Sequence, residues 1–181
     1  AAHCVQAGTR VSLFGLPAKA GDPTGLAARA IAGLAKLEPA PLAVKDRVAA
    51  IVAANYGTDL PRLAECDIVI EAIAERLDWK RDLYEKITPH LAPGAVLVSN
   101  TSGLSLAALS AAVPEALRAQ FCGMHFFNPP RYMYLVELIA GPHTDAALLY
   151  VLETFLTSTL GKGVIRAKVT PNFLGNRVGL S

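Results

Sequence analysis

The stretch Asp67-Ile68-Val69-Ile70-Glu71-Ala72 decides the fold, because it sets a continuous apolar run between two acidic residues. A run without polar alternation is typical of a parallel strand buried on both faces of a sheet. A helical pattern follows over residues 78–91, with Asp78 as its candidate N-cap, and residues 95–99 form the next apolar run. A strand, a helix and a second strand in this order predict a right-handed crossover between parallel strands.

The same alternation continues on both sides of this crossover. Toward the N-terminus, residues 10–14 predict a strand, residues 24–37 a helix that begins at Thr24, and residues 45–55 a second helix. Toward the C-terminus the sequence predicts a helix at 104–112, strands at 120–127 and 134–140, a long helix at 144–160 and a last strand at 163–167. The two strands that flank Pro129-Pro130 have a short link, so they could be antiparallel. The predicted fold is an α/β domain whose doubly wound parallel sheet carries helices on both faces.

The composition excludes several classes of protein. Of the 181 residues, 52% are hydrophobic and 18% charged, which is enough apolar material for a large core and argues against disorder. A net charge of +2 without a Lys/Arg cluster predicts no nucleic-acid partner. The three cysteines, Cys4, Cys66 and Cys122, lie far apart among apolar residues and predict buried thiols of a reducing compartment, with no disulfide and no metal site. No apolar run approaches the roughly 20 residues of a membrane span, and no signal segment opens the chain, so we expect a cytoplasmic protein.

Both ends of the chain suggest a longer protein. Residues 1–8 resemble the second half of a helix that ends at Gly8, and Ser181 stands a few residues into another predicted helix. We therefore expect the 181 residues to be a fragment.

Polar side chains follow the predicted strands, at the sheet edge where ligands bind in such folds. Glu75 and Lys80 follow one strand, Ser99-Asn100-Thr101-Ser102 follow the next, and His125 and Asn128 lie at the end of a third. Each has an ordinary alternative. The Asn100-Thr101-Ser102 run could cap a helix, the two charges near a helix start could be solvated, and a lone histidine is more often a satisfied core residue.

Glu137 is harder to explain as an ordinary core position. Its carboxylate stands between Leu135-Val136 and Leu138-Ile139, where burial is costly unless another group pairs with it. His125 is the obvious candidate. A carboxylate that meets an imidazole is the basic unit of general acid–base catalysis near neutral pH, so the pair predicts an enzyme.

With these residues the chain resembles the NAD-binding domain of the 3-hydroxyacyl-CoA dehydrogenases, the hydride-transfer enzymes of fatty-acid β-oxidation. The matching segments run in family order and are 67–75 with Lys80, 99–102, 123–130, 135–137, 161–162 and 170–177. The resemblance implies a Rossmann-type fold, NAD as cofactor and a 3-hydroxyacyl-CoA as substrate. The Asn128-to-Met133 segment looks like that of the longer bacterial enzymes.

The resemblance also implies a role for each matching residue. His125 would be the general base for the substrate's 3-hydroxyl, and Glu137 would orient its ring. Ser102 and Asn128 would hold the substrate oxygen and the nicotinamide side. The remaining matches are Glu75 and Lys80, at the cofactor's ribose and nicotinamide end, and Asn176, at the substrate.

Family organisation divides the chain at residue 170. Residues 1–170 would be an N-terminally truncated NAD-binding domain, whose first strand and Gly-rich phosphate turn are missing. Residues 171–181 would begin the helical domain, through which the parent protein forms a homo-oligomer and without which the fragment is a poor catalyst. The chain departs from the family at Gly15, where an acid usually holds the adenosine ribose, so the preference for NAD over NADP stays open.

Two further hypotheses remain. The first is a dehydrogenase of another 3-hydroxy acid on the same fold, because a fold alone does not fix a substrate. The second is a non-catalytic structural domain of a multifunctional chain, for which Gly15 is the best support.

Overall fold

The computed structural model describes residues 1–17, 22, 24–38, 40–43 and 45–167. The chain separates into two compact units. Unit 1 consists of Ala1–Pro61 and Asn128–Tyr134, and unit 2 of Arg62–Phe127 and the chain from Leu135 onward. The predicted boundary at residue 170 and the segment 171–181, including Asn176, lie outside the described residues.

Unit 1 is built on two parallel strands. Its elements are α1 (Ala2–Gln6), β1 (Val11–Gly15), α2 (Gly25–Leu34), the 3-10 helix η1 (Lys45–Ala50) and β2 (Ile51–Asn55). All five residues of β1 pair in register with β2, from Val11 opposite Ile51 to Gly15 opposite Asn55. A small core forms around Val5, Ile31, Leu42 and Ile51. Another 3-10 helix, η2 (Leu60–Glu65), leads into unit 2.

The Asn128–Tyr134 segment is anchored within unit 1 on one backbone carbonyl. Arg131 donates from Nη1 to the carbonyl oxygen of Ala40 at 2.7 Å, and the Tyr132 hydroxyl donates to the same oxygen at 2.8 Å. The segment thus belongs to unit 1 although both strands that flank it belong to unit 2.

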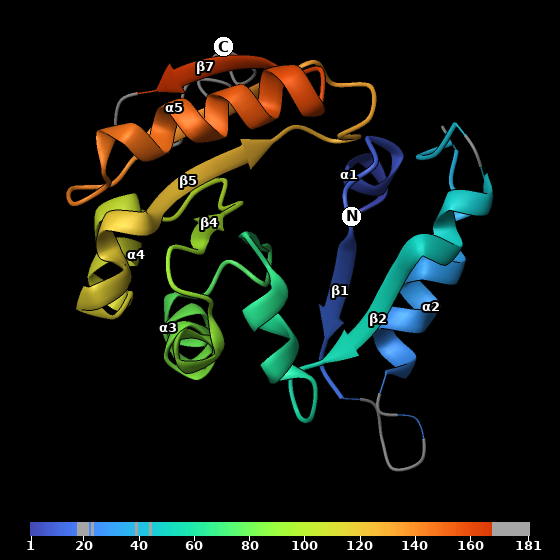
Figure 1. Cartoon of the computed structure of the whole chain (residues 1–181), viewed down its shortest axis with the longest axis horizontal. Helices are drawn as coiled ribbons and strands as arrows, with labels where there is room; N and C mark the ends of the chain where they lie inside the picture. Colours follow the sequence, from blue (N-terminus) through green and yellow to red (C-terminus); the bar gives the residue numbers. More distant parts are fainter. Residues whose placement is uncertain (18–21, 23, 39, 44, 168–181) are drawn as a thin grey trace. The chain divides into compact units, whose positions relative to one another are not determined.

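Unit 2 is a five-stranded sheet with helices. The strands in spatial order are β3 (Ile68–Glu71), β4 (Val96–Ser99), β5 (Phe121–Phe126), β6 (Leu135–Ala140) and β7 (Gly163–Ala167). All neighbours are parallel except β5 and β6, which are antiparallel as their short link allows. The helical elements are α3 (Leu77–Ile87), η3 (Thr88–His90), α4 (Leu106–Ala112), η4 (Glu115–Gln120) and α5 (Ala146–Thr154), which continues as the π-helical turn η5 (Phe155–Thr159). In Figure 1, α3 and α4 lie on one side of β5 and α5 lies on the other.

Close packing at Gly123 brings α4 onto the strands that carry His125 and Glu137. A Cβ atom at Gly123 would lie 3.2 Å from Cδ1 of Ile139 and 3.3 Å from Cδ1 of Leu106. Leu106 and Ile139 are both fully buried, so neither has room to give way. A glycine is therefore needed here by space, since it lets the helix and the two strands meet.

The predicted strands and most helices are confirmed, but the helix predicted over 45–55 is wrong. Those residues form η1 followed by β2. The branched side chains of Ile51 and Val52 favour a strand, and pairing with β1 satisfies the backbone of the whole segment. Apolar spacing over so short a window does not separate a helix from a strand.

Of the two predicted helix caps, Thr24 is confirmed in position and Asp78 needs correction. The N-cap of α3 is Arg76, and Asp78 lies in the first turn, where it forms an ion pair with Arg76 at 2.6 Å. Thr24 does stand at the N-cap of α2, but its side chain makes no capping hydrogen bond with a described residue. An acid in the first turn still favours α3, because it faces the positive end of the helix dipole.

Burial differs from expectation at two places. Within the described residues β3 pairs with β4 alone, and Ile70 is 38% exposed, whereas the continuous apolar run predicts burial on both faces. Of the three cysteines, only Cys122 is buried, while Cys4 and Cys66 are partly exposed.

Candidate active site

The buried pair His125–Glu137 lies at the centre of the candidate site. The two residues face each other across the antiparallel pair β5–β6, and Nδ1 of His125 lies 2.8 Å from Oε2 of Glu137. Their exposed fractions are 6% and 1%. An ionised carboxylate only accepts hydrogen bonds, so this contact favours the tautomer with the proton on Nδ1. Nε2 is then the basic nitrogen of the ring, which is the arrangement of a general base with an orienting carboxylate.

Aromatic packing adds to the orientation of the imidazole. The ring of Phe127 lies 4.7 Å from that of His125, centroid to centroid, at an interplanar angle of 55°. Such tilted ring pairs are favourable. The histidine ring is therefore held both by a hydrogen bond and by a neighbouring ring.

A second cluster joins the β3–α3 loop to the β4–α4 loop. The carboxylate of Glu75 accepts hydrogen bonds from the Thr101 hydroxyl at 2.7 Å, the Ser102 backbone N–H at 2.6 Å and the Ser102 hydroxyl at 3.2 Å. Thr101 is 1% exposed, whereas Glu75 itself lies at the surface. The structure thus brings two of the predicted site residues, Glu75 and Ser102, into direct contact.

These contacts keep the Glu75 carboxyl ionised. Partial burial raises the pKa of Glu75, but the hydrogen bonds from Ser102 and Thr101 and the charge of Lys80 outweigh it, so the pKa lies below its ordinary value of 4.5. At neutral pH the group is an exposed hydrogen-bond acceptor, which suits the hydroxyls of a sugar.

Lys80 does not share the exposed position of Glu75. Its ammonium is buried and lies 2.6 Å from Oε1 of Glu71, at 1% side-chain exposure for both residues. Tyr84 and Ser99 donate hydroxyl hydrogen bonds to Oε2 of the same carboxylate, at 2.9 and 2.7 Å. Burial and the charge of Glu71 raise the pKa of Tyr84 far above its ordinary value, so the phenol keeps its proton and donates. The prediction that Lys80 contacts a cofactor stays a prediction.

Sequence reasoning missed this buried cluster. In the sequence Glu71 is only the acidic boundary of an apolar run, and no local pattern predicts its role or that of Tyr84. The sequence did contain a signal for this cluster. A buried acid at the end of a strand requires a partner in the core, and Lys80 is one of the buried residues of α3.

The three asparagines of the prediction lie in different places. Asn100 ties strand ends together, because its Oδ1 accepts the backbone N–H of Phe126 at 2.9 Å, next to His125. Asn128 is exposed and belongs to unit 1, and Asn176 lies outside the described residues. The functional roles of Asn128 and Asn176 stay predictions.

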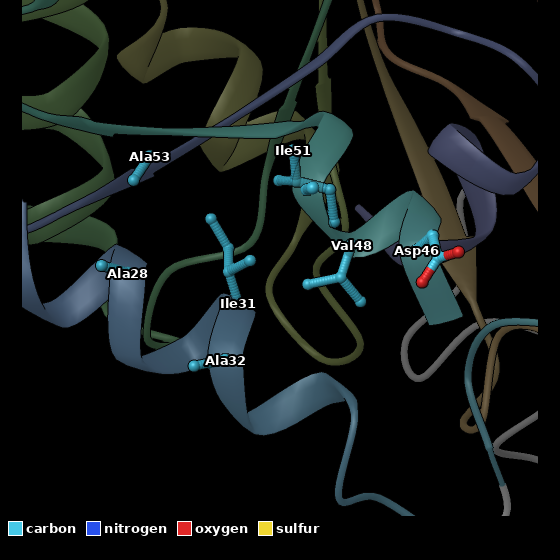
Figure 2. Close-up of a pocket in the computed structure, with 8 residues that line it drawn as sticks. Ala28, Ile31, Ala32, Asp46, Val48, Ile51 and Ala53 are labelled. Atoms are coloured by element: carbon cyan, nitrogen blue, oxygen red, sulfur yellow. The ribbon is translucent and has the colours of Figure 1, made fainter. Parts of the chain in front are cut away.

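Unit 1 has an open apolar pocket that contains no predicted site residue (Figure 2). Its volume is about 480 Å³, and its lining residues are Ala28, Ile31, Ala32, Asp46, Val48, Ala49, Ile51 and Ala53. Asp46 alone among these eight is charged, so the pocket offers little for orienting a polar ligand.

At the carboxyl end of β1, Gly15 pairs with Asn55. The buried side-chain amide of Asn55 donates hydrogen bonds to Thr58 and Asp59.

The described part of the chain contains no group of three or more His, Cys, Asp or Glu residues that could hold a metal ion. None of its helices is both long enough and apolar enough to cross a membrane.

Sequence comparison places the chain among known proteins. Residues 1–170 match the family model described as 3-hydroxyacyl-CoA dehydrogenase, NAD binding domain. A trifunctional enzyme assigned to the fatty acid oxidation complex of Rickettsia felis is 42% identical over 158 residues, which are 87% of this chain and 22% of that protein. A protein assigned as a 3-hydroxyacyl-CoA dehydrogenase in Deinococcus radiodurans is 38% identical over 182 residues, covering 99% of this chain and 52% of its own length. The chain thus spans from about a fifth to about half of these relatives.

Solved structures show the same fold. The 3-hydroxybutyryl-CoA dehydrogenase of Escherichia coli K12 superposes with a TM-score of 0.79 at 31% identity, over 98% of this chain and 37% of that one. The (S)-3-hydroxybutyryl-CoA dehydrogenase of Ralstonia eutropha gives a TM-score of 0.75 at 33% identity, over 98% of this chain and 61% of that one. These neighbours share the parallel-sheet, Rossmann-type architecture of unit 2. Because the family model covers all but the last residues of the chain, the protein belongs to the 3-hydroxyacyl-CoA dehydrogenases and corresponds to their NAD-binding domain.

Proposed function

We propose that the complete protein oxidises a 3-hydroxyacyl-CoA to the 3-oxoacyl-CoA with NAD, as a step of fatty-acid β-oxidation. The observation that carries this proposal is the buried pair of His125 and Glu137, 2.8 Å apart near the carboxyl end of β5. Two apolar residues at these positions would cost less free energy to bury than an imidazole and a carboxylate. The buried pair therefore indicates a role beyond packing. Family membership supplies the reaction class.

The residues of this structure fit the nicotinamide side of the cofactor. Glu75 offers an exposed, ionised carboxylate for ribose hydroxyls, with the hydroxyl of Ser102 3.2 Å away. We assign Lys80 to the same side of the cofactor, with its ammonium buried beside Glu71. The adenosine side fits less well, because β1 ends at Gly15 without a carboxylate.

Catalysis then divides between cofactor and protein. When bound, NAD accepts the hydride from C3 of the substrate. His125 takes the proton of the 3-hydroxyl, with Nε2 as the base. Glu137 holds the ring by Nδ1 and stabilises the imidazolium that forms. Ser102 and Asn128 orient the substrate oxygen, and Asn176 contacts the substrate.

The proposal extends to the setting of the enzyme. Residues 1–170 act as the NAD-binding domain, and residues 171–181 begin a helical domain that completes the acyl-CoA site and joins subunits into a homo-oligomer. The working compartment is the cytoplasm, where cysteine thiols stay reduced.

The test is turnover by the complete protein. NADH oxidation with acetoacetyl-CoA, followed by the loss of NADH absorbance and run beside NADPH, should show saturable activity. Activity that survives removal of CoA from the substrate would point to a dehydrogenase of another 3-hydroxy acid.

A non-catalytic domain is the second candidate, and Gly15 is the observation that favours it. Such a domain would show no turnover and no saturable change in NADH fluorescence. Binding of NADH without turnover of any 3-oxoacyl substrate would support the cofactor site but reject the proposed reaction.

A further inference from the structure

We propose that Glu71 is a positioning residue, whose buried carboxylate fixes the β3–α3 loop and thereby places Glu75 for the cofactor. The consequence for cofactor binding rests on the proposed function, while the positioning itself does not. No part of this role follows from the His125–Glu137 pair, which lies on other strands.

The carboxylate of Glu71 accepts four hydrogen bonds, and we call Glu71 and its donors the hub. Oε1 accepts the ammonium of Lys80 at 2.6 Å and the backbone N–H of Ile73 at 2.7 Å. Oε2 accepts the hydroxyls of Tyr84 at 2.9 Å and Ser99 at 2.7 Å. These donors come from the loop, from α3 and from β4. Four donors on one carboxylate satisfy its acceptor sites, as burial of a charge requires.

The loop is therefore held at both ends. Glu71 fixes its start through Ile73, whose carbonyl oxygen also lies 3.4 Å from Nζ of Lys80. Glu75, four residues after Glu71, fixes its end on Thr101 and Ser102. A short loop tied at two points has few conformations left, which prepares Glu75 before any ligand arrives.

Lys80 links the two ends electrostatically. Its charge balances Glu71 at 2.6 Å and also helps to lower the pKa of Glu75. With its ammonium directed at Glu71 and Ile73, Lys80 acts on the cofactor through the loop. Tyr84 has no exposed surface, and its ring packs edge-on against Phe121 at 5.8 Å, so the hub is fastened to the core of the sheet.

The test compares Glu71→Gln with a control that destabilises unit 2 elsewhere. Leu152→Ala removes a fully buried side chain from α5, which carries none of the hub donors. Each variant of the complete protein is studied at the same interval below its own unfolding midpoint. Hydrogen exchange is followed by mass spectrometry in peptides that cover 72–76 and 99–104, and NADH affinity by fluorescence.

We expect Glu71→Gln to speed exchange in both peptides and to raise the Kd for NADH roughly tenfold, because a charged hydrogen-bond acceptor is lost. The KM for NADH should rise more than kcat falls. Leu152→Ala should leave exchange in those peptides and the NADH Kd as in the wild type. If Glu71→Gln does not fold, Tyr84→Phe combined with Ser99→Ala removes both donors from Oε2 and should act in the same direction, more weakly.

Wild-type exchange and wild-type NADH affinity in a folded hub variant would overturn the positioning role, as would equal losses in Leu152→Ala. Failure of the proposed function looks different. A wild-type protein that binds no NADH would reject the cofactor site, while the exchange data would still decide whether Glu71 fixes the loop.

Discussion

His125 and Glu137 are directly opposed residues in the antiparallel pair β5–β6, so the register of two strands sets the 2.8 Å contact between imidazole and carboxylate. Successive side chains on a strand point to opposite faces, and a slip of one residue would separate the two groups. Backbone pairing on both sides of the contact therefore preorganises the base. The short link at Asn128–Tyr134 is covalently attached to both strands and restricts such a slip further.

Replacement of His125 by alanine should lower kcat of the complete protein by a factor of about 10² to 10⁴, the usual contribution of a general base. NADH affinity should change little, because no cofactor contact is assigned to this side chain. Steady-state kinetics with acetoacetyl-CoA and a fluorescence titration with NADH measure the two quantities. Equal kcat in variant and wild type would reject the mechanism.

Replacement of Glu137 by glutamine keeps the shape of the side chain and removes its charge. We expect kcat to fall and its pH profile to shift, since the imidazolium loses its anionic partner. Glu153→Gln is a suitable control, because that carboxylate pairs with Arg166 at the surface. A pH profile that matches the wild type in Glu137→Gln would mean that the two residues are not coupled.

Glu75 predicts a defined pH dependence of stability. Its pKa is lower in the folded chain than the ordinary 4.5, so its contribution is complete above that value and disappears as pH falls through the lower folded pKa. Glu75→Gln should therefore flatten the acid side of the curve of unfolding free energy against pH. Urea titrations from neutral pH down to about pH 3 test this. A variant curve parallel to the wild type would show that the Thr101 and Ser102 contacts carry no such linkage.

Gly15→Asp should strengthen NADH binding and weaken NADPH binding, because a carboxylate at the end of this strand holds ribose hydroxyls and repels a 2′-phosphate. The structure has space for the change. A Cβ atom at Gly15 would lie 3.4 Å from the backbone nitrogen of Ala27 and 3.5 Å from its Cβ, which is ordinary contact. Paired Kd values for the two cofactors give the measurement, and an unchanged ratio would mean that another group holds the ribose.

Cys122 should resist alkylation in the folded protein. Burial raises the pKa of its thiol to about 12, so almost no thiolate forms near pH 8. Iodoacetamide should label the partly exposed Cys4 and Cys66 first, and Cys122 only as unit 2 unfolds. Peptide mass spectrometry follows each site, and labelling of Cys122 at the rate of Cys66 would contradict its burial.

The fold could be predicted in outline because strand-forming runs are local. The apolar runs before Glu71 and Ser99 and after Gln120 each form a strand at the expected place. The helix prediction for residues 45–55 was wrong because their structure is decided by pairing with β1, some forty residues away in the chain. The exposure of Ile70 could not be seen either, because a local apolar run does not say how far each of its side chains is covered.

The candidate site was predictable where one residue broke a pattern. Glu137 interrupts an apolar strand, so its need for a partner was visible in the sequence, and His125 meets that need. The hub around Glu71 was hidden, because its side-chain donors lie 9, 13 and 28 residues further along the chain. Contacts over such separations depend on tertiary packing, which no local pattern carries.

The attachment of Asn128–Tyr134 to unit 1 has a consequence for how the protein is made. The chain passes between the units after Pro61, again after Phe127 and again after Tyr134. During translation β3, β4 and β5 emerge before Arg131 and Tyr132 reach the carbonyl of Ala40. Unit 1 therefore cannot finish as an early, self-contained product of the ribosome, and a gene cut at Pro61 would yield it without its last segment.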